Sequence, residues 1–334
     1  MRTAIVAAIV AGLAVAAVGG ATPELEQRWA PQRSGNSSAY QSRNGATATE
    51  NFSRRLRLGS SGRVSLSNVS GAIVVSGASG DEVSIEATKR TRGARSLLDD
   101  VRIEVEERSG RINIRTVYPE RGWRGEGVSV DYTLTIPAQA AIDVVSVSGS
   151  VKVSRVKGTI SATTISGDVA LSEAARIELA KAISGSIEIV DSTLEAETEL
   201  STVSGSMRLR DVNARDLQLK TVSGRFEATA LSSDRLNIQS ISGRVDFSGK
   251  LSRNGRYSFG SHSGSVRLAL LQEAGFELDA DTFSGSIRSD FPGRTVQASG
   301  GRSRSARSLE ATVGDGSATV RVQTFSGSIV IERR

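Results

Sequence analysis

The dipeptide Ser-Gly recurs along most of the chain at a nearly constant spacing, and this repeat constrains the fold more than any other feature. Copies occur 18 to 21 residues apart, with one double interval before the last, at Ser148-Gly149, Ser166-Gly167, Ser184-Gly185, Ser204-Gly205, Ser223-Gly224, Ser242-Gly243, Ser263-Gly264, Ser284-Gly285 and Ser326-Gly327. Self-similarity at a fixed period of this length is the signature of a solenoid. We therefore expect an all-β fold, a single-stranded β-helix (β-solenoid) with coils of 18 to 21 residues.

Apolar residues alternate on both sides of each Ser-Gly pair. With the Ser at position 0, they occupy positions −6, −4, −1, +3 and +5, which around Ser223 are Leu217, Leu219, Val222, Phe226 and Ala228. Each half has the period of two that is typical of a strand with one buried face. The parity changes between −4 and −1, which a straight strand cannot accommodate without exposing its apolar set. We therefore expect a corner near the Thr at −2, with the −1 side chains pointing inward.

The −1 positions form a row that becomes bulkier toward the C-terminus: Val147, Ile165, Ile183, Val203, Val222, Ile241, His262, Phe283 and Phe325. His262 is the only histidine of the chain, and we expect it to be partly buried and satisfied by hydrogen bonds. A zinc site built from His and Cys ligands is excluded, because the sequence has no second His and no Cys.

The +1 position of the repeat is always Gly, and a Gly at an inward strand position marks a tight bend or a close backbone approach. We assign this structural role to Gly71, Gly110, Gly149, Gly167, Gly185, Gly205, Gly224, Gly243, Gly264, Gly285 and Gly327. An alternative is that the stacked Ser hydroxyls bind a ligand, although no residue near them is placed as a general base.

The first residues combine a charged start with an apolar run and small residues, which is typical of a secretory signal peptide. We expect residues 1–21 to be the signal peptide and residues 22–50 to be a flexible polar linker. An uncleaved membrane anchor is the alternative. The predicted location is therefore exported: periplasm, outer membrane or cell surface. Since the chain has no Cys, it has neither disulfides nor a cysteine for lipid attachment.

The strand pattern begins near residue 51 and divides into two parts. Residues 51–137 carry only two recognisable copies, Ser70-Gly71 and Ser109-Gly110, so this part forms either degenerate solenoid coils or a cap; we favour coils. Residues 138–334 form the regular solenoid, with an interruption near residues 293–308. We expect the last copy, TFSGSIVIE, to form the outermost coil with an open edge.

The chain carries a formal net charge of +6, and part of the excess lies in the interruption. Its arginines are candidate contacts for an anionic ligand: Arg294, Arg302, Arg304 and Arg307. The partner is unknown; envelope polysaccharide, anionic lipid or a surface protein would suit a basic exported surface. Export and an aromatic content of 4% argue against nucleic acid.

The sequence offers no catalytic, cofactor-binding or metal site. It lacks a phosphate-binding loop, a nucleophile elbow and a dinucleotide fingerprint. The outward +4 positions have mixed signs, which suits ion pairs between coils rather than the paired carboxylates of a polysaccharide-cleaving enzyme. We therefore expect a protein that is not an enzyme and needs no cofactor.

The repeats TTISGDV, STVSGSM, KTVSGRF, DTFSGSI and QTFSGSI resemble those of the bacterial putative adhesin family of β-strand-repeat (Ser-Gly repeat) proteins, related to the head domain of putative autotransporter adhesins. The start LSNVSGAIVVSGASGDEVSIEATKR and the ending GDGSATVRVQTFSGSIVIE are similar to that family too, so the resemblance covers roughly residues 52–334. It implies a β-solenoid, an envelope or surface location and an adhesion role, and it carries no catalytic residues.

These observations predict an exported, non-enzymatic protein of the cell envelope, an adhesin-like binding or structural module. Two alternatives stay open. The first is a periplasmic envelope-stress accessory protein that contacts anionic lipid or a membrane partner through its basic segment. The second is a polysaccharide-active enzyme, which would need a carboxylate cluster on adjacent coils.

Overall fold

The computed structural model describes residues 47–119, 127–270, 275–297 and 307–334, and these belong to one compact unit, Gly45–Arg334. The predicted signal peptide (residues 1–21) and nearly all of the predicted linker (residues 22–50) lie outside the described residues. The fold is all-β: 21 strands form one continuous sheet, and the only helix in the described ranges is α1 (Leu97–Asp100). No described helix has the length and hydropathy that crossing a membrane requires.

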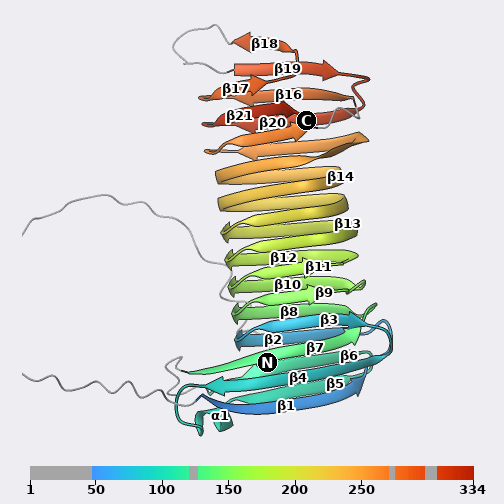
Figure 1. The fold of residues 1–334 in the computed structure, drawn as a ribbon, viewed down its shortest axis with the longest axis vertical. Helices are drawn as coiled ribbons and strands as arrows, with labels where there is room; N and C mark the ends of the chain where they lie inside the picture. The colour runs from blue at the N-terminus through green and yellow to red at the C-terminus, as the bar shows by residue number, and fades with distance from the viewer. Residues whose placement is uncertain (1–46, 120–126, 271–274, 298–306) are drawn as a thin grey trace, which may run out of the picture. The chain divides into compact units, whose positions relative to one another are not determined.

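The regular coils stack on one another through parallel strands (Figure 1). Before each corner, these strands pair in chain order: β8 (Ala141–Ser148), β10 (Thr159–Ser166), β12 (Arg176–Ser184), β13 (Ile187–Ser204) and β14 (Met207–Ser261). After the corner, β9 (Val151–Ser154), β11 (Val169–Ser172) and the start of β13 pair in the same way. The repeat serines are register partners from coil to coil, as in Ser148↔Ser166 and Ser204↔Ser223.

The core consists of rows of inward side chains, one row for each buried position of the repeat. Around Ser223 the buried residues are Leu217, Leu219, Thr221, Phe226 and Ala228. The alternation −6, −4, −2 therefore continues up to the corner, and the Thr at −2 fills an inward place. The predicted inward direction of the −1 row is wrong, and so is the predicted corner at −2. The strand stays straight through the Thr, the −1 side chain points outward, and the chain turns at the Ser-Gly pair itself.

Five successive coils turn again seven residues after the Ser. Five non-Gly residues there have φ between 50° and 58°: Arg155, Glu173, Asp191, Asp211 and Ala230. Such left-handed conformations cost about 1–2 kcal/mol per L-residue. The stacking of identical corners compensates for this cost, because each turn is held by the coils on either side of it.

The N-terminal part combines coils with an antiparallel cap. β2 (Arg63–Ser70) and β3 (Ile73–Ala78) form a coil directly against β8 and β9. On the other side of that coil lie β6 (Arg111–Val117) and β7 (Val128–Pro137). The remaining strands are antiparallel to their neighbours and cover this end of the stack: β1 (Ala48–Arg57), β4 (Glu82–Thr91) and β5 (Arg102–Arg108).

The C-terminal coils do not stack in chain order. The last coil, β20 (Ala318–Thr324) and β21 (Ser328–Arg333), lies between two earlier coils. Its neighbours are the end of β14 with β15 (Val266–Leu270) on one side and β16 (Phe276–Thr282) with β17 (Ser286–Ser289) on the other. The prediction of an outermost last coil is therefore wrong. Antiparallel β19 (Arg307–Val313) and β18 (Arg294–Gln297) follow beyond β16 (Figure 1).

Candidate functional site: an exposed apolar ridge along the coil corners

The −1 side chains line up from coil to coil and form an apolar row on the outside of the corner, which we call the corner ridge. In the order of the stack it consists of Val69, Val147, Ile165, Ile183, Val203, Val222, Ile241, His262, Phe325 and Phe283. Exposure is substantial, at 40% for Val147 and 54% for Ile241, whereas Ile165 and Ile183 are half-buried. A row of mostly exposed, mostly apolar side chains of this kind is a candidate interaction surface, because isolated surface apolar residues do not line up in this way.

The C-terminal end of the corner ridge is aromatic. The ring of His262 stacks on Phe325 and that of Phe325 on Phe283, with centroids 4.9 Å apart and interplanar angles of 5° and 9°. The predicted burial of His262 is therefore wrong: its side chain is exposed on the ridge. The ring faces cover one another, so this part of the ridge presents mainly ring edges and cannot offer a series of free faces for stacking on sugar rings.

The glycines of the repeat allow the corner to be this tight. A Cβ on Gly224 would collide with the carbonyl oxygen of Gly205, and a Cβ on Gly205 would collide with that of Gly185. Equivalent collisions occur at Gly149, Gly167, Gly185, Gly243, Gly264, Gly285 and Gly327, and Gly71 meets the carbonyl of Val130. The glycines thus permit the close backbone approach that turns the next side chains to a different face.

Gly110 does not belong to this ladder. It lies in the hairpin between β5 and β6 with φ 68°, and a Cβ there would meet nothing within 4 Å. Its assignment as a repeat glycine is corrected accordingly. A turn residue with positive φ also favours Gly, which explains how the dipeptide Ser109-Gly110 imitates the repeat.

Hydroxyl side chains at −2 lie beneath the corner and are buried. Thr202 donates a hydrogen bond to the carbonyl of Gly185 (3.2 Å) and Thr282 to that of Gly327 (3.4 Å). The hydroxyls of Ser146, Thr221, Ser240 and Ser261 are buried without a hydrogen-bond partner. Because this row points inward, it supports the corner. The Ser residues at position 0 are instead exposed beside the ridge.

A groove of about 740 Å³ runs beside the C-terminal half of the corner ridge. One wall is the ridge from Val203 to Phe283 in the order of the stack, and the opposite wall is the −3 row: Ser201, Lys220, Gln239, Gly260 and Gln323. Gly260 has no side chain, so the polar wall is interrupted opposite His262. The groove is therefore amphipathic and elongated along the stack.

The ion pairs of the coils lie mainly on the rows farther from the ridge. Arg208 pairs with Glu227 (3.8 Å), which is a cross-coil pair that the mixed +4 row predicts. Arg267 of the +4 row pairs instead with Glu332 (3.4 Å), which lies two residues beyond that row. Lys220, on the groove wall, pairs with Glu199 (3.1 Å). All of these charges are exposed, so each pair contributes at most about 1 kcal/mol to stability. The ridge positions and the adjacent Ser row carry no Asp, Glu, Lys or Arg side chain.

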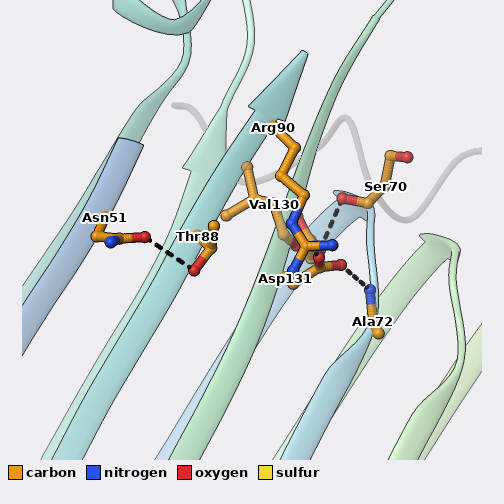
Figure 2. A network of polar contacts seen from close by, with 8 residues as sticks. Asn51, Ser70, Ala72, Thr88, Arg90, Val130 and Asp131 are labelled. Carbon is orange, nitrogen blue, oxygen red and sulfur yellow. Dashed lines mark hydrogen bonds and ion pairs between the residues drawn. The ribbon is translucent and has the colours of Figure 1, made fainter. Parts of the chain in front are cut away.

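A second hollow, of about 760 Å³, lies at the cap end of the corner ridge beside Val69. Here Asp131 accepts a hydrogen bond from the backbone N–H of Ala72 (2.8 Å) and pairs with Arg90 (3.2 Å), as Figure 2 shows. Tyr118 also lines this hollow, and burial raises its pKa to about 12. Arg90 is thus paired with Asp131, and Arg92 is a second cationic side chain that lines the hollow.

The structure does not bring the four candidate arginines together as a described site. Arg302 and Arg304 lie outside the described residues, and Arg294 is placed only by its backbone, in β18. Arg307 is exposed at the start of β19. Within the described ranges, no group of three or more His, Asp or Glu side chains is arranged to hold a metal ion.

Comparison with known proteins places the fold. The Toastrack DUF4097 family matches residues 63–332. A comparison with curated proteins found no match. Among solved structures, a putative adhesin from Parabacteroides distasonis ATCC 8503 is 14% identical with a TM-score of 0.44, covering 85% of this chain and 97% of that one. A putative adhesin from Bacteroides fragilis NCTC 9343 is 11% identical with a TM-score of 0.36, covering 84% and 97%.

A putative lipid binding protein from Parabacteroides distasonis ATCC 8503 is similar as well, at 13% identity and a TM-score of 0.38, covering 85% of this chain and 96% of that one. These three likenesses are too distant to carry an argument about function. The family match is different in kind, because it spans the coils from β2 to β21. The chain therefore belongs to the Toastrack DUF4097 family.

Proposed function

We propose that this protein is an exported, non-enzymatic module of the cell envelope, built on a β-solenoid with coils of 18 to 21 residues. It acts in an adhesin-like way, by contact along its corner ridge with another macromolecule. The relation to Ser-Gly-repeat adhesins and to autotransporter adhesin heads is part of this proposal. So are the absence of a cofactor and the location in the periplasm, outer membrane or cell surface.

The observation that carries the proposal is the continuous exposure of the corner ridge. A folded chain gains about 25 cal/mol for each Å² of apolar surface that it removes from water. The repeat could have placed polar residues at −1, as it does at the neighbouring position 0, without disturbing the core. Apolar residues at nine of ten successive corners therefore point to a surface that is covered when the protein functions.

The first experiment determines where the protein is located in the cell and what it binds. Fractionation with surface labelling of intact cells distinguishes surface, outer-membrane and periplasmic locations; a cytoplasmic chain would contradict export. The purified full chain is then applied to an array of envelope glycans, anionic lipid vesicles and matrix proteins, at low and physiological salt.

Two variants test whether any binding on the array depends on the corner ridge. Ile241→Ser removes an exposed ridge side chain, and Lys152→Ser removes an exposed side chain of the +4 row as a control. Binding that survives physiological salt and falls only in Ile241→Ser supports the proposal. Binding that is equally retained by both variants and vanishes with salt would instead favour the arginines near residues 294–307 and the accessory-protein alternative.

A further inference from the structure

The corner ridge has the same spacing as the strands that carry it, and this spacing restricts what can cover it. Successive ridge side chains follow the strand separation of about 4.8 Å, as the 4.9 Å ring separations illustrate. An extended peptide presents side chains of one face about every 6.8 Å, and an α-helix advances about 5.4 Å per turn. Neither the peptide nor the helix stays in register with the ridge over ten coils, because its spacing differs from that of the coils. A second copy of this stack has the same spacing and therefore stays in register.

We infer that the corner ridge is a self-complementary interface through which two copies of this chain pair with their stacks antiparallel. The inference rests on the proposed function and names the partner of the same surface. The contact is isologous, because the same ridge is used by both copies.

The taper of the ridge favours the antiparallel arrangement. Valine occupies its N-terminal end and aromatic rings occupy its C-terminal end. In antiparallel packing, one register uses all ten positions. In this register a large side chain lies opposite a small one at each end of the ridge, and side chains of medium size lie opposite each other in the middle. The pairs are Val69 with Phe283, Val147 with Phe325, Ile165 with His262, Ile183 with Ile241, and Val203 with Val222. Parallel packing would place ring against ring and valine against valine, which leaves a wedge-shaped gap.

The charges beside the ridge are placed differently in the two arrangements. In antiparallel packing the −3 row of one copy faces the −3 row of the other, and Lys220 then lies opposite Ser201 and Lys181 opposite Gln239. On the other flank Arg225 faces Ser206 and Arg244 faces Ser186. In parallel packing the −3 row would face the +2 row, which would place Lys220 opposite Arg225. Charges of like sign therefore lie directly opposite each other only in the parallel arrangement, whereas in the antiparallel one the two copies of Lys220 are offset by one strand separation.

The size of the surface suits a reversible dimer. Ten positions at about 4.8 Å extend over about 43 Å, and the band from −3 to +2 is about 15 Å wide at the rise of a strand. The contact is therefore on the order of 600 Å² on each copy, at the lower limit for a specific protein interface. We expect dissociation in the micromolar range rather than an obligate dimer.

The test combines the association state with cysteine cross-linking of the full chain, which has no native Cys. Analytical ultracentrifugation of the wild type should show a concentration-dependent monomer–dimer equilibrium. Ile241→Asp should weaken it more than tenfold with unchanged circular dichroism and melting, because this side chain is 54% exposed. Lys152→Asp, an equally new carboxylate on the +4 row, should leave the equilibrium unchanged.

Single cysteines then report the orientation. Val222→Cys should form a cross-linked dimer with a short bifunctional reagent, because it lies next to the middle of the ridge. Val147→Cys alone should not, since its counterpart lies about 34 Å away at seven strand separations. An equimolar mixture of Val147→Cys and Phe325→Cys should cross-link efficiently. Cross-linking of every single variant with itself would instead establish parallel packing and overturn the inference.

A folded wild type that stays monomeric up to high micromolar concentration would also overturn the inference. If that monomer still binds a glycan or lipid through the ridge, the proposed function stands and only the partner is wrong. If the chain forms a ridge-dependent antiparallel dimer but is not exported, the inferred dimer stands and the proposed function is wrong.

Discussion

A single glycine in each coil determines how the corner is built. In the stack from Gly71 onward, the repeat glycine of one coil lies against the backbone carbonyl of the preceding layer, so the ladder tolerates no Cβ. The glycine also determines the direction in which the preceding side chains point. Because the chain turns there, the apolar residue two positions before it lies on the outside of the corner, and the Thr or Ser before that lies on the inside.

Gly224→Val tests this ladder. We expect it to lower the free energy of unfolding by about 2–4 kcal/mol, because the new side chain must displace the carbonyl of Gly205 and separate two coils. Urea denaturation measures the change. Gly260→Ala is the matched control: its Cβ would have its nearest contact at an ordinary 3.7 Å, so a small effect is expected. Equal stability of both variants would contradict the close approach.

At the scale of elements, a buried polar network joins the first coil, β2 and β3, to the adjacent strands β6 and β7. Asn68 of β2 donates a hydrogen bond to the carbonyl of Val130 in β7 (2.8 Å) and accepts one from Thr116 in β6 (2.9 Å). The Thr116 hydroxyl also lies 2.7 Å from that of Tyr132. Asn68 occupies the −2 position, where most of the regular coils carry a buried Thr or Ser.

We expect Asn68→Ala to destabilise the protein by about 2–3 kcal/mol, because it leaves the buried carbonyl of Val130 and the hydroxyl of Thr116 with fewer partners. Thr88→Ala is a suitable control, since it removes only the exposed bond between Thr88 and Asn51 (3.1 Å, Figure 2). Thermal unfolding compares the two. A loss no larger than that of the control would mean that the packing of β6 and β7 on the first coil does not depend on this network.

The same network makes the protein sensitive to alkaline pH. Burial raises the pKa of Tyr132 to about 12 from its usual value of 10.0, so the folded state favours the neutral phenol. This stabilisation is fully present below pH 10 and is lost as the pH rises toward 12, because the unfolded chain ionises first. A shift of this size corresponds to about 2–3 kcal/mol.

Tyr132→Phe should therefore reduce the pH dependence of stability. Denaturation in urea at pH 9 and pH 11 should show a smaller loss for the variant than for the wild type, even though its stability at pH 9 is about 1 kcal/mol lower without the hydroxyl contact. The same loss in both proteins would show that Tyr132 does not titrate in this way.

At the scale of the whole molecule, the last coil holds earlier coils together. β20 lies between β14 and β16, and β21 lies between β15 and β17. The strands β16 to β19 therefore depend on residues that follow them in the chain. A stack in chain order would instead tolerate the loss of its final coil, because a terminal repeat contacts only one neighbour.

Truncation after residue 317 distinguishes these two arrangements. We expect β16 and β19 to lose protection from hydrogen exchange, while β8 to β13 keep theirs, because the latter coils pair only with one another and with β2, β3 and β14. A shorter truncation, after residue 333, leaves β20 and β21 complete and serves as the control. Protection of β16 in the longer truncation would contradict the inserted coil.

The sequence by itself determined the repeat, its strand content and the rows that form the core. Leu217, Leu219, Phe226 and Ala228 are buried as their period of two predicts, because alternation requires only local backbone geometry. Mixed charges at +4 likewise predicted a pair such as Arg208–Glu227. The ridge could have been recognised from the same pattern, since the Thr or Ser at −2 continues the −6 and −4 alternation. Hydrophobicity alone misled, because Val222 is more apolar than Thr221.

Only the tertiary structure decided which side of the corner the −1 row occupies, where Gly110 lies and which coils are neighbours. The direction of the −1 row depends on the contact between Gly224 and the coil below it, which no single repeat contains. β20 pairs with β14 on one side and with β16 on the other, although all coils carry nearly the same sequence pattern. Its place in the stack therefore depends on which coil edges are free to pair with it. A repeat specifies its own shape locally, whereas the order of stacking is settled by contacts between distant segments and by the caps that end the stack.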